Sequence, residues 1–103
     1  MKKEELLNIQ SGTMITQRCL PTNVLPNYVD LHIIVDSIEQ SNTDKNTILI
    51  YNKLIYKYIN KKFYEVFHSS PCTIIEKWLP DISITNKEIE KKVLEKQDII
   101  EEF

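Results

Sequence analysis

The sequence predicts a small α+β protein in which strands dominate. The segment 47–67 is rich in Ile, Tyr and Phe, which suit a pleated, half-buried surface. The whole chain of 103 residues contains no alanine, the residue that favours helices most. The clearest helical patterns lie near the two ends of the chain, where we expect a short N-terminal helix and a C-terminal helix. A chain of this length forms one domain, which we expect to span residues 1–103.

The N-terminal part predicts one short helix followed by two strands. Residues 2–10 can form an amphipathic helix, and Gly12, the only glycine, lies where a helix would stop. Residues 13–20 have a strand-like pattern, and a loop bounded by two prolines follows at 21–26. Residues 29–38 alternate as a buried strand does. In that strand we expect Val29, Leu31, Ile33 and Val35 on one face, and Asp30, His32, Ile34 and Asp36 on the other.

The centre of the chain predicts a loop and then a meander. Residues 39–46 are polar throughout and rich in turn formers, which indicates the loop. Residues 47–67 predict about three strands, with turns at 52–53 and 60–62, because Asn tolerates the backbone angles of tight turns. The same segment also has helical periodicity, so a helix is the alternative. A helix would stack like-charged lysines four residues apart, where they repel.

Two more strands are predicted after the meander. Residues 72–79 form a strand candidate that Pro80 closes, and we expect Trp78 to belong to the core. Ile82 and Ile84 indicate a further short strand.

The C-terminal helix is predicted to begin at Thr85. Thr85 and Glu88 have the spacing of a capping box, in which each side chain satisfies a backbone N–H at the helix start. Apolar residues then form a stripe beside a charged face. The alternative to nucleic-acid binding is a protein-interaction module encoded by a mobile element, which would dock through the apolar and acidic helix at 89–103.

Composition and motifs argue against several classes of protein. No apolar segment approaches the roughly 20 residues of a membrane helix and no leader pattern is present, so we expect a soluble, cytoplasmic protein. A single glycine excludes phosphate-binding loops and nucleophile elbows, and no activated nucleophile can be assembled, so we expect no catalysis. The cysteines and histidines have no metal-ligand spacing, so we expect free thiols and no metal or cofactor. His32 is interpreted as hydrogen-bonded on a solvated strand face.

The distribution of lysines is the strongest functional signal. Five lysines fall between Lys45 and Lys62 with no acidic residue among them, and aromatic residues alternate with them. Proteins hold single-stranded nucleic acid with cations along the backbone and aromatic rings under the bases. RNA is therefore the expected partner. The alternative is that the lysines form an ordinary solvated edge over core aromatics. The candidate phosphate contacts are Arg18, Lys53, Lys57, Lys61 and Lys62, and the candidate stacking residues are Tyr51 and Tyr64.

The segment TQRCLPTNVLPNYVDLHIIVDSIEQ, residues 16–40, together with the Lys/Tyr-rich segment after it, resembles the small PrgU-type regulators of pheromone-responsive conjugative plasmids in enterococci. The resemblance covers most of the chain. It implies a PUA-like β-barrel with flanking helices, RNA binding, and negative control of transfer-gene or surface-adhesin expression.

Overall fold

A computed structural model gives the fold, and it describes residues 1–19, 29–59, 62–66, 71–95 and 99–102. Of residues 19, 29, 53–55, 57–59, 62–66 and 99–102 it describes the backbone alone. Strands outnumber helices among the described elements, which confirms the predicted α+β class. In chain order the elements are α1 (Lys3–Leu7), β1 (Met14–Cys19), β2 (Val29–Gln40), β3 (Thr47–Ile59), β4 (Lys62–Val66), β5 (Cys72–Ile75), the 3₁₀ helix η1 (Glu76–Asp81), β6 (Ile82–Ile84), α2 (Lys87–Leu94) and β7 (Ile99–Glu102).

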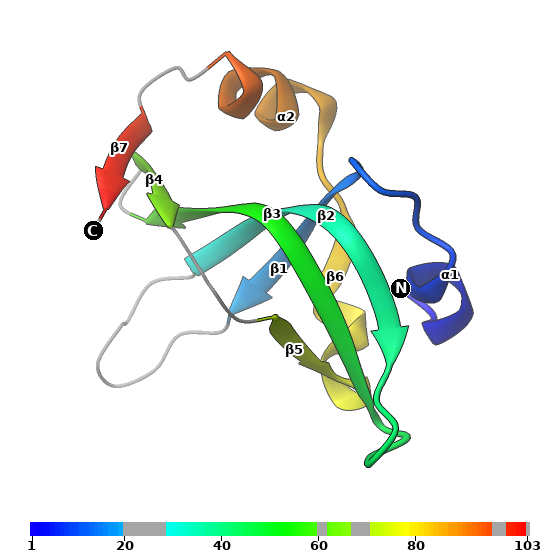
Figure 1. Ribbon diagram of the computed structural model, residues 1–103. Coiled ribbons are helices and arrows are strands. Elements are labelled where there is room, and N and C mark those ends of the chain that lie inside the picture. The colour runs from blue at the N-terminus through cyan, green and yellow to red at the C-terminus, as the bar shows by residue number, and fades with distance from the viewer. Residues whose placement is uncertain (20–28, 60–61, 67–70, 96–98, 103) are drawn as a thin grey trace.

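All the described strands belong to one sheet (Figure 1). Its order is β6-β1-β2-β3-β4-β7, and β5 pairs with the free part of β3. Neighbouring strands are antiparallel except β4 and β7, which run parallel. No pairing joins β6 to β7 in the described residues, so the closed barrel implied by the resemblance is not seen there.

The β2–β3 ribbon is the centre of the sheet. β2 has 12 residues and β3 has 13, and their register shifts between Ile34 and Ser37. Beyond this irregularity β3 changes its other neighbour: residues 47–50 pair with β5, and residues 55–59 pair with β4. The bent ribbon therefore carries the two halves of the sheet.

The predicted three-strand meander is wrong at its first turn. β3 continues through residues 52–53, and Asn52 pairs with Val35 at the irregularity. The register skips Lys53 in β3 and Asp36 in β2, so an irregularity in the ladder takes the place of the predicted turn. At the second predicted turn, Lys62 already belongs to β4, while residues 60–61 lie outside the described part of the chain.

Two apolar cores lie on opposite faces of the sheet. Ile15 belongs to the larger core, whereas the preceding residue, Met14, belongs to the smaller one, because successive strand residues point to opposite faces. α1 and η1 contribute to the larger core, and α2 covers the smaller one (Figure 1). The larger core consists of Leu6, Ile15, Ile33, Val35, Ile48, Ile50, Ile74, Leu79 and Ile82; the smaller consists of Met14, Tyr56 and Val93.

The N-terminal predictions are close to the structure. α1 is shorter than the predicted helix at residues 2–10, and its Leu6 is fully buried. Gly12 has a φ of 91°, a left-handed conformation that suits glycine after a helix. β1 and β2 match the two predicted strands, and the loop predicted at 21–26 lies outside the described residues.

The C-terminal helix differs from its prediction at both ends. Its N-cap is Asn86, whose side-chain oxygen accepts a hydrogen bond from the Glu88 backbone N–H at 2.8 Å, so the Thr85 capping box is wrong. The helix ends at Leu94, and Ile99–Glu102 form β7. β-Branched Ile99 and Ile100 suit a strand, and the edge of β4 offers them backbone partners. The predicted docking helix at 89–103 therefore extends only to Leu94 within the described residues, and Val93 within it is buried.

The predicted strand at 72–79 ends early. β5 stops at Ile75, and η1 follows with Pro80 inside it. Trp78 is 39% exposed rather than part of the core, because the 3₁₀ turn buries Leu79 instead. The short strand predicted at Ile82 and Ile84 is confirmed as β6. No helix in the described ranges is long and apolar enough to cross a membrane.

Candidate nucleic-acid interface

A partly buried chain of polar side chains joins β1, β2 and Thr85, which lies between β6 and α2. His32 is 1% exposed and its Nδ1 lies 2.8 Å from the Thr16 hydroxyl, which lies 2.8 Å from the Thr85 hydroxyl. Burial lowers the pKa of His32, and the charge of Asp30 partly opposes this effect. The interpretation of His32 as a residue on a solvated face is thus wrong. A neutral imidazole in this position holds two strands and a helix start together.

Arg18 has an acidic partner on the neighbouring strand. Its Nε donates to Asp30 Oδ1 at 2.9 Å and its Nη2 donates to Asp30 Oδ2 at 3.2 Å. The two residues are also direct register partners in β1 and β2. The Arg18 side chain is 57% exposed, so it can still reach solvent. Because Asp30 already compensates the guanidinium charge, Arg18 is a weaker phosphate contact than the sequence suggests.

Tyr51 lies far from the other candidates along β3. Its hydroxyl donates to Glu39 Oε1 at 2.7 Å, and this hydrogen bond is the main cause that raises the pKa of Tyr51. Lys57 is six positions further along, roughly 20 Å at the usual rise per strand residue. Lys53 also lies in β3, beside the register shift. The structure therefore does not bring Tyr51 together with Lys57 and Tyr64.

The backbone register brings other candidates together. Lys57 pairs with Leu31 of β2 on one side and with Tyr64 of β4 on the other. Leu31 in turn pairs with Gln17 of β1. We call these four positions, Gln17, Leu31, Lys57 and Tyr64, the central row. The row crosses four strands, roughly 14 Å at the usual spacing. Lys62 pairs with Ile59 at the end of the β3–β4 ribbon, and Lys61 lies outside the described residues.

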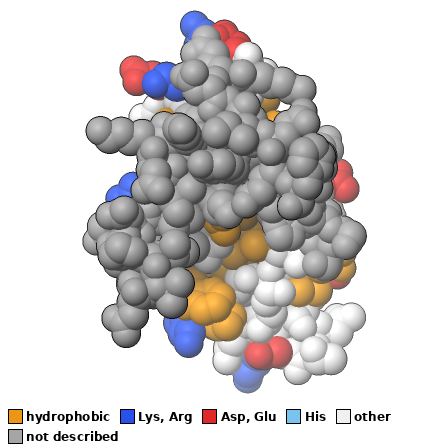
Figure 2. Space-filling view, turned by 90° about the vertical axis from the view of Figure 1, so that its left-hand side faces the viewer, with side chains coloured by type: hydrophobic (Ala, Val, Ile, Leu, Met, Phe, Trp, Pro, Cys, Tyr) orange, Lys and Arg blue, Asp and Glu red, His pale blue; other side chains and the backbone are white. Residues whose placement is uncertain are grey.

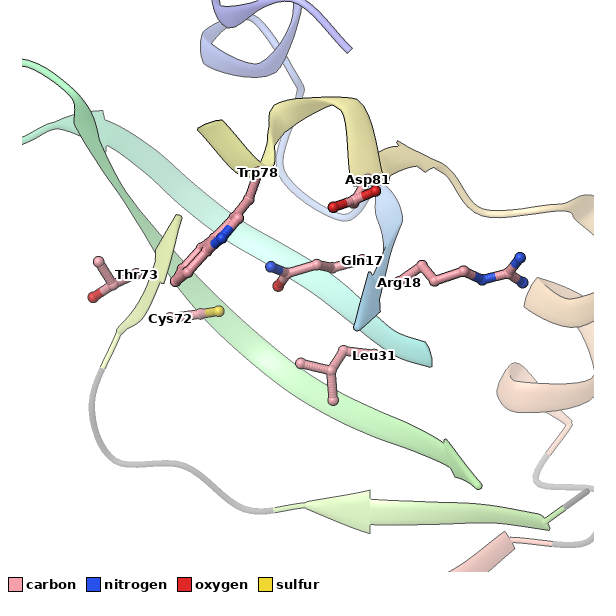
Figure 3. A pocket seen from close by; sticks show the side chains of 7 residues that line it. All are labelled: Gln17, Arg18, Leu31, Cys72, Thr73, Trp78 and Asp81. Carbon is pink, nitrogen blue, oxygen red and sulfur yellow. The ribbon is translucent and has the colours of Figure 1, made fainter. Parts of the chain in front are cut away.

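A pocket of about 410 Å³ lies at one end of the central row (Figure 3). β1 and β2 provide Gln17 and Leu31, β5 provides one wall, and η1 provides the rim. In Figure 3 the Trp78 ring reaches from η1 towards Cys72 and Gln17, while the Arg18 guanidinium points away from them. Figure 2, a view from the side of β4 and β7, shows hydrophobic side chains exposed next to undescribed residues. The pocket is lined by Gln17, Arg18, Leu31, Cys72, Thr73, Trp78 and Asp81.

Trp78 lines the pocket, whereas the sequence predicts it in the core. Its neighbour Lys77 holds Nζ 5.5 Å from the centroid of the Trp78 ring, within the range of a cation–π contact. Pro80, two residues later, was a signal that a strand could not continue through this segment. No local signal showed that Gln17 and Asp81 would face the same pocket, since that depends on how η1 folds back over β1.

The described residues contain no group of three or more metal-ligating side chains. Cys72 is half-buried, and His32 is hydrogen-bonded to Thr16. His68 and the side chain of Cys19 lie outside what the structure describes. The polar groups of the pocket can orient a ligand by hydrogen bonds.

The chain matches no family model, no curated protein and no solved structure.

Proposed function

We propose that this protein binds single-stranded RNA as a regulator, without catalysing a reaction. One observation carries the proposal: the register places Lys57 and Tyr64 in the same cross-strand row as Gln17 and Leu31, which line the pocket. A row of this kind lets one RNA strand contact a cation, an aromatic residue and a pocket in succession, which is how sheet surfaces commonly hold unpaired nucleotides.

The candidate residues contribute unequally to this proposal. Lys57, Lys61 and Lys62 are the phosphate contacts we favour, and Tyr64 is the stacking residue. Arg18 carries less of the proposal because Asp30 compensates its charge. Lys53 and Tyr51 carry less still, since they lie further along β3, and the Tyr51 hydroxyl is held by Glu39.

The regulatory part of the proposal comes from the sequence resemblance to PrgU-type regulators. On that basis we propose negative control of plasmid transfer or adhesin gene expression, with a PUA-like arrangement of the sheet. The pocket and the central row support only the RNA-binding part.

A charge reversal tests the RNA-binding part. We expect Lys57→Glu/Lys62→Glu to weaken binding of a labelled single-stranded RNA pool. It should also reduce the slope of log affinity against log salt by about 1.4, at about 0.7 per lost phosphate contact. The measurement is a fluorescence-anisotropy titration at several salt concentrations.

The matched control reverses the same charge elsewhere. Lys87 and Lys92 are exposed on α2, which covers the smaller core on the other face of the sheet. We expect Lys87→Glu/Lys92→Glu to leave the salt slope unchanged. Equal losses in both variants would mean that only net charge matters, and no binding by folded wild type at low salt would reject the proposal. Circular dichroism checks that each variant is folded.

A further inference from the structure

The pocket at the end of the central row has chemistry that selects its occupant. We propose that it binds one unpaired nucleobase that carries an exocyclic amino group, stacked on Trp78. This inference rests on the proposed function, since it takes RNA as the ligand, and it adds a base-recognition site that lies apart from the lysines.

Trp78 gives the pocket an aromatic surface. Trp78 is 39% exposed in the described structure and lines the pocket, so part of its ring is accessible to a ligand. Lys77 Nζ lies over the indole, and the same indole lines the pocket. A tryptophan face accepts any base by stacking.

The shape of the pocket also favours a base. Leu31 of β2 and Cys72 of β5 give it apolar walls, and its volume of about 410 Å³ falls within the range of small-ligand sites. Figure 3 shows the indole above these side chains, with the Gln17 amide facing it across the pocket. A flat ring fits such a space better than a branched phosphate group.

The polar side chains that line the pocket favour a hydrogen-bonding base over a phosphate. The side chains of Gln17 and Asp81 are half-buried, and neither makes a hydrogen bond within the described residues. The Asp81 carboxylate only accepts hydrogen bonds, and the Gln17 amide can donate and accept. The Arg18 guanidinium is hydrogen-bonded to Asp30 and points away from the pocket. It therefore does not neutralise the negative charge of Asp81, which would repel a phosphate.

These groups favour some bases over others. Adenine, cytosine and guanine present an exocyclic amino group that can donate to Asp81, beside an acceptor that can take the Gln17 amide N–H. Where cytosine presents its exocyclic amino group, uracil presents the O4 carbonyl, which would face the Asp81 carboxylate and be repelled by it. We therefore expect discrimination of about tenfold against uracil, the size of one well-made polar pair.

Trp78 is the only tryptophan in the chain, so its fluorescence reports on this pocket directly. The experiment titrates wild type with the RNA hexamers rA6, rC6 and rU6 and follows tryptophan emission. Anisotropy of the same hexamers carrying a fluorescent label measures total binding. We expect rA6 and rC6 to quench the emission over the concentrations that raise the anisotropy, and rU6 to bind about tenfold more weakly.

Two variants sharpen the test. Trp78→Ala should weaken rC6 binding about tenfold or more by removing the stacking surface. Asp81→Asn should reduce the difference in affinity between rC6 and rU6. The matched control is Asp36→Asn, because Asp36 is an exposed carboxylate on β2 that does not line the pocket. It should change neither the affinity for rC6 nor the difference in affinity between rC6 and rU6.

The outcomes separate this inference from the proposed function. If the hexamers bind by anisotropy while emission and the Trp78→Ala affinity stay unchanged, the pocket proposal is wrong and RNA binding stands. If rU6 binds as tightly as rC6 and Asp81→Asn has no effect, the amino-group selectivity is wrong. If no hexamer binds folded wild type, both proposals fall.

Discussion

The Thr16 hydroxyl connects two buried polar side chains, His32 and Thr85. Its oxygen lies 2.8 Å from both His32 Nδ1 and the Thr85 hydroxyl. The sequence assigned Thr85 to a helix cap and His32 to solvent, because a pattern in one segment does not show which hydroxyl from another segment will meet it. Only the pairing of β1 with β2 and β6 brings the three side chains together.

We expect Thr16→Val to lower the free energy of unfolding by about 1–3 kcal/mol, because it removes a partner from two buried polar groups at once. Thr85→Val, at the end of the chain of hydrogen bonds, should cost less. Urea denaturation followed by circular dichroism measures both. A Thr85→Val loss equal to or larger than that of Thr16→Val would contradict the central position of Thr16.

His32 should make stability depend on pH. Its pKa in the folded protein lies below the ordinary value of 6.5 because burial disfavours the charged imidazole. The unfolded chain therefore binds the proton more readily, so stability is complete above about pH 7.5 and falls as the pH drops below 6.5. We expect His32→Gln to flatten the decline measured by urea denaturation between about pH 8 and 5.5. An unchanged decline in this variant would contradict the assignment.

At the scale of elements, strand existence was predictable and strand length was not. Alternating apolar residues identified β1, β2 and β6, since burial on one face imposes a period of two. Residues 52–53 predict a turn because Asn tolerates the backbone angles of tight turns, but β3 runs on through a register shift against β2. Likewise β7 could not be distinguished from a helix end, because its strand state depends on the edge of β4.

The start of α2 offers a sharp test at this scale. Asn86 caps the helix by accepting from the Glu88 N–H, so Asn86→Ala should lower the free energy of unfolding by about 1 kcal/mol. Glu88→Ala should cost only a few tenths, because the cap uses the backbone of Glu88. Thermal denaturation compares the two. A larger loss for Glu88→Ala would restore the capping box that the sequence suggested.

At the scale of the molecule, the fold class followed from composition and the candidate site only in part. Lys57 and Tyr64 were identified from charge and aromatic content, and the register places them beside each other. Gln17, Trp78 and Asp81 were not identified, because their proximity arises where η1 folds over β1, a contact between distant segments. Trp78 was misassigned because large apolar residues in strand-like segments usually enter the core.

We propose that the central row and the pocket together form an RNA interface. The most direct measurement is a ¹H–¹⁵N correlation spectrum of the labelled protein during titration with single-stranded RNA. We predict shifts of the backbone amides of Gln17, Leu31, Lys57 and Tyr64 and of the Trp78 indole N–H, with the exposed face of α2 unchanged. Shifts confined to α2 or to the region around Tyr51, or no shifts at all, would contradict the claim.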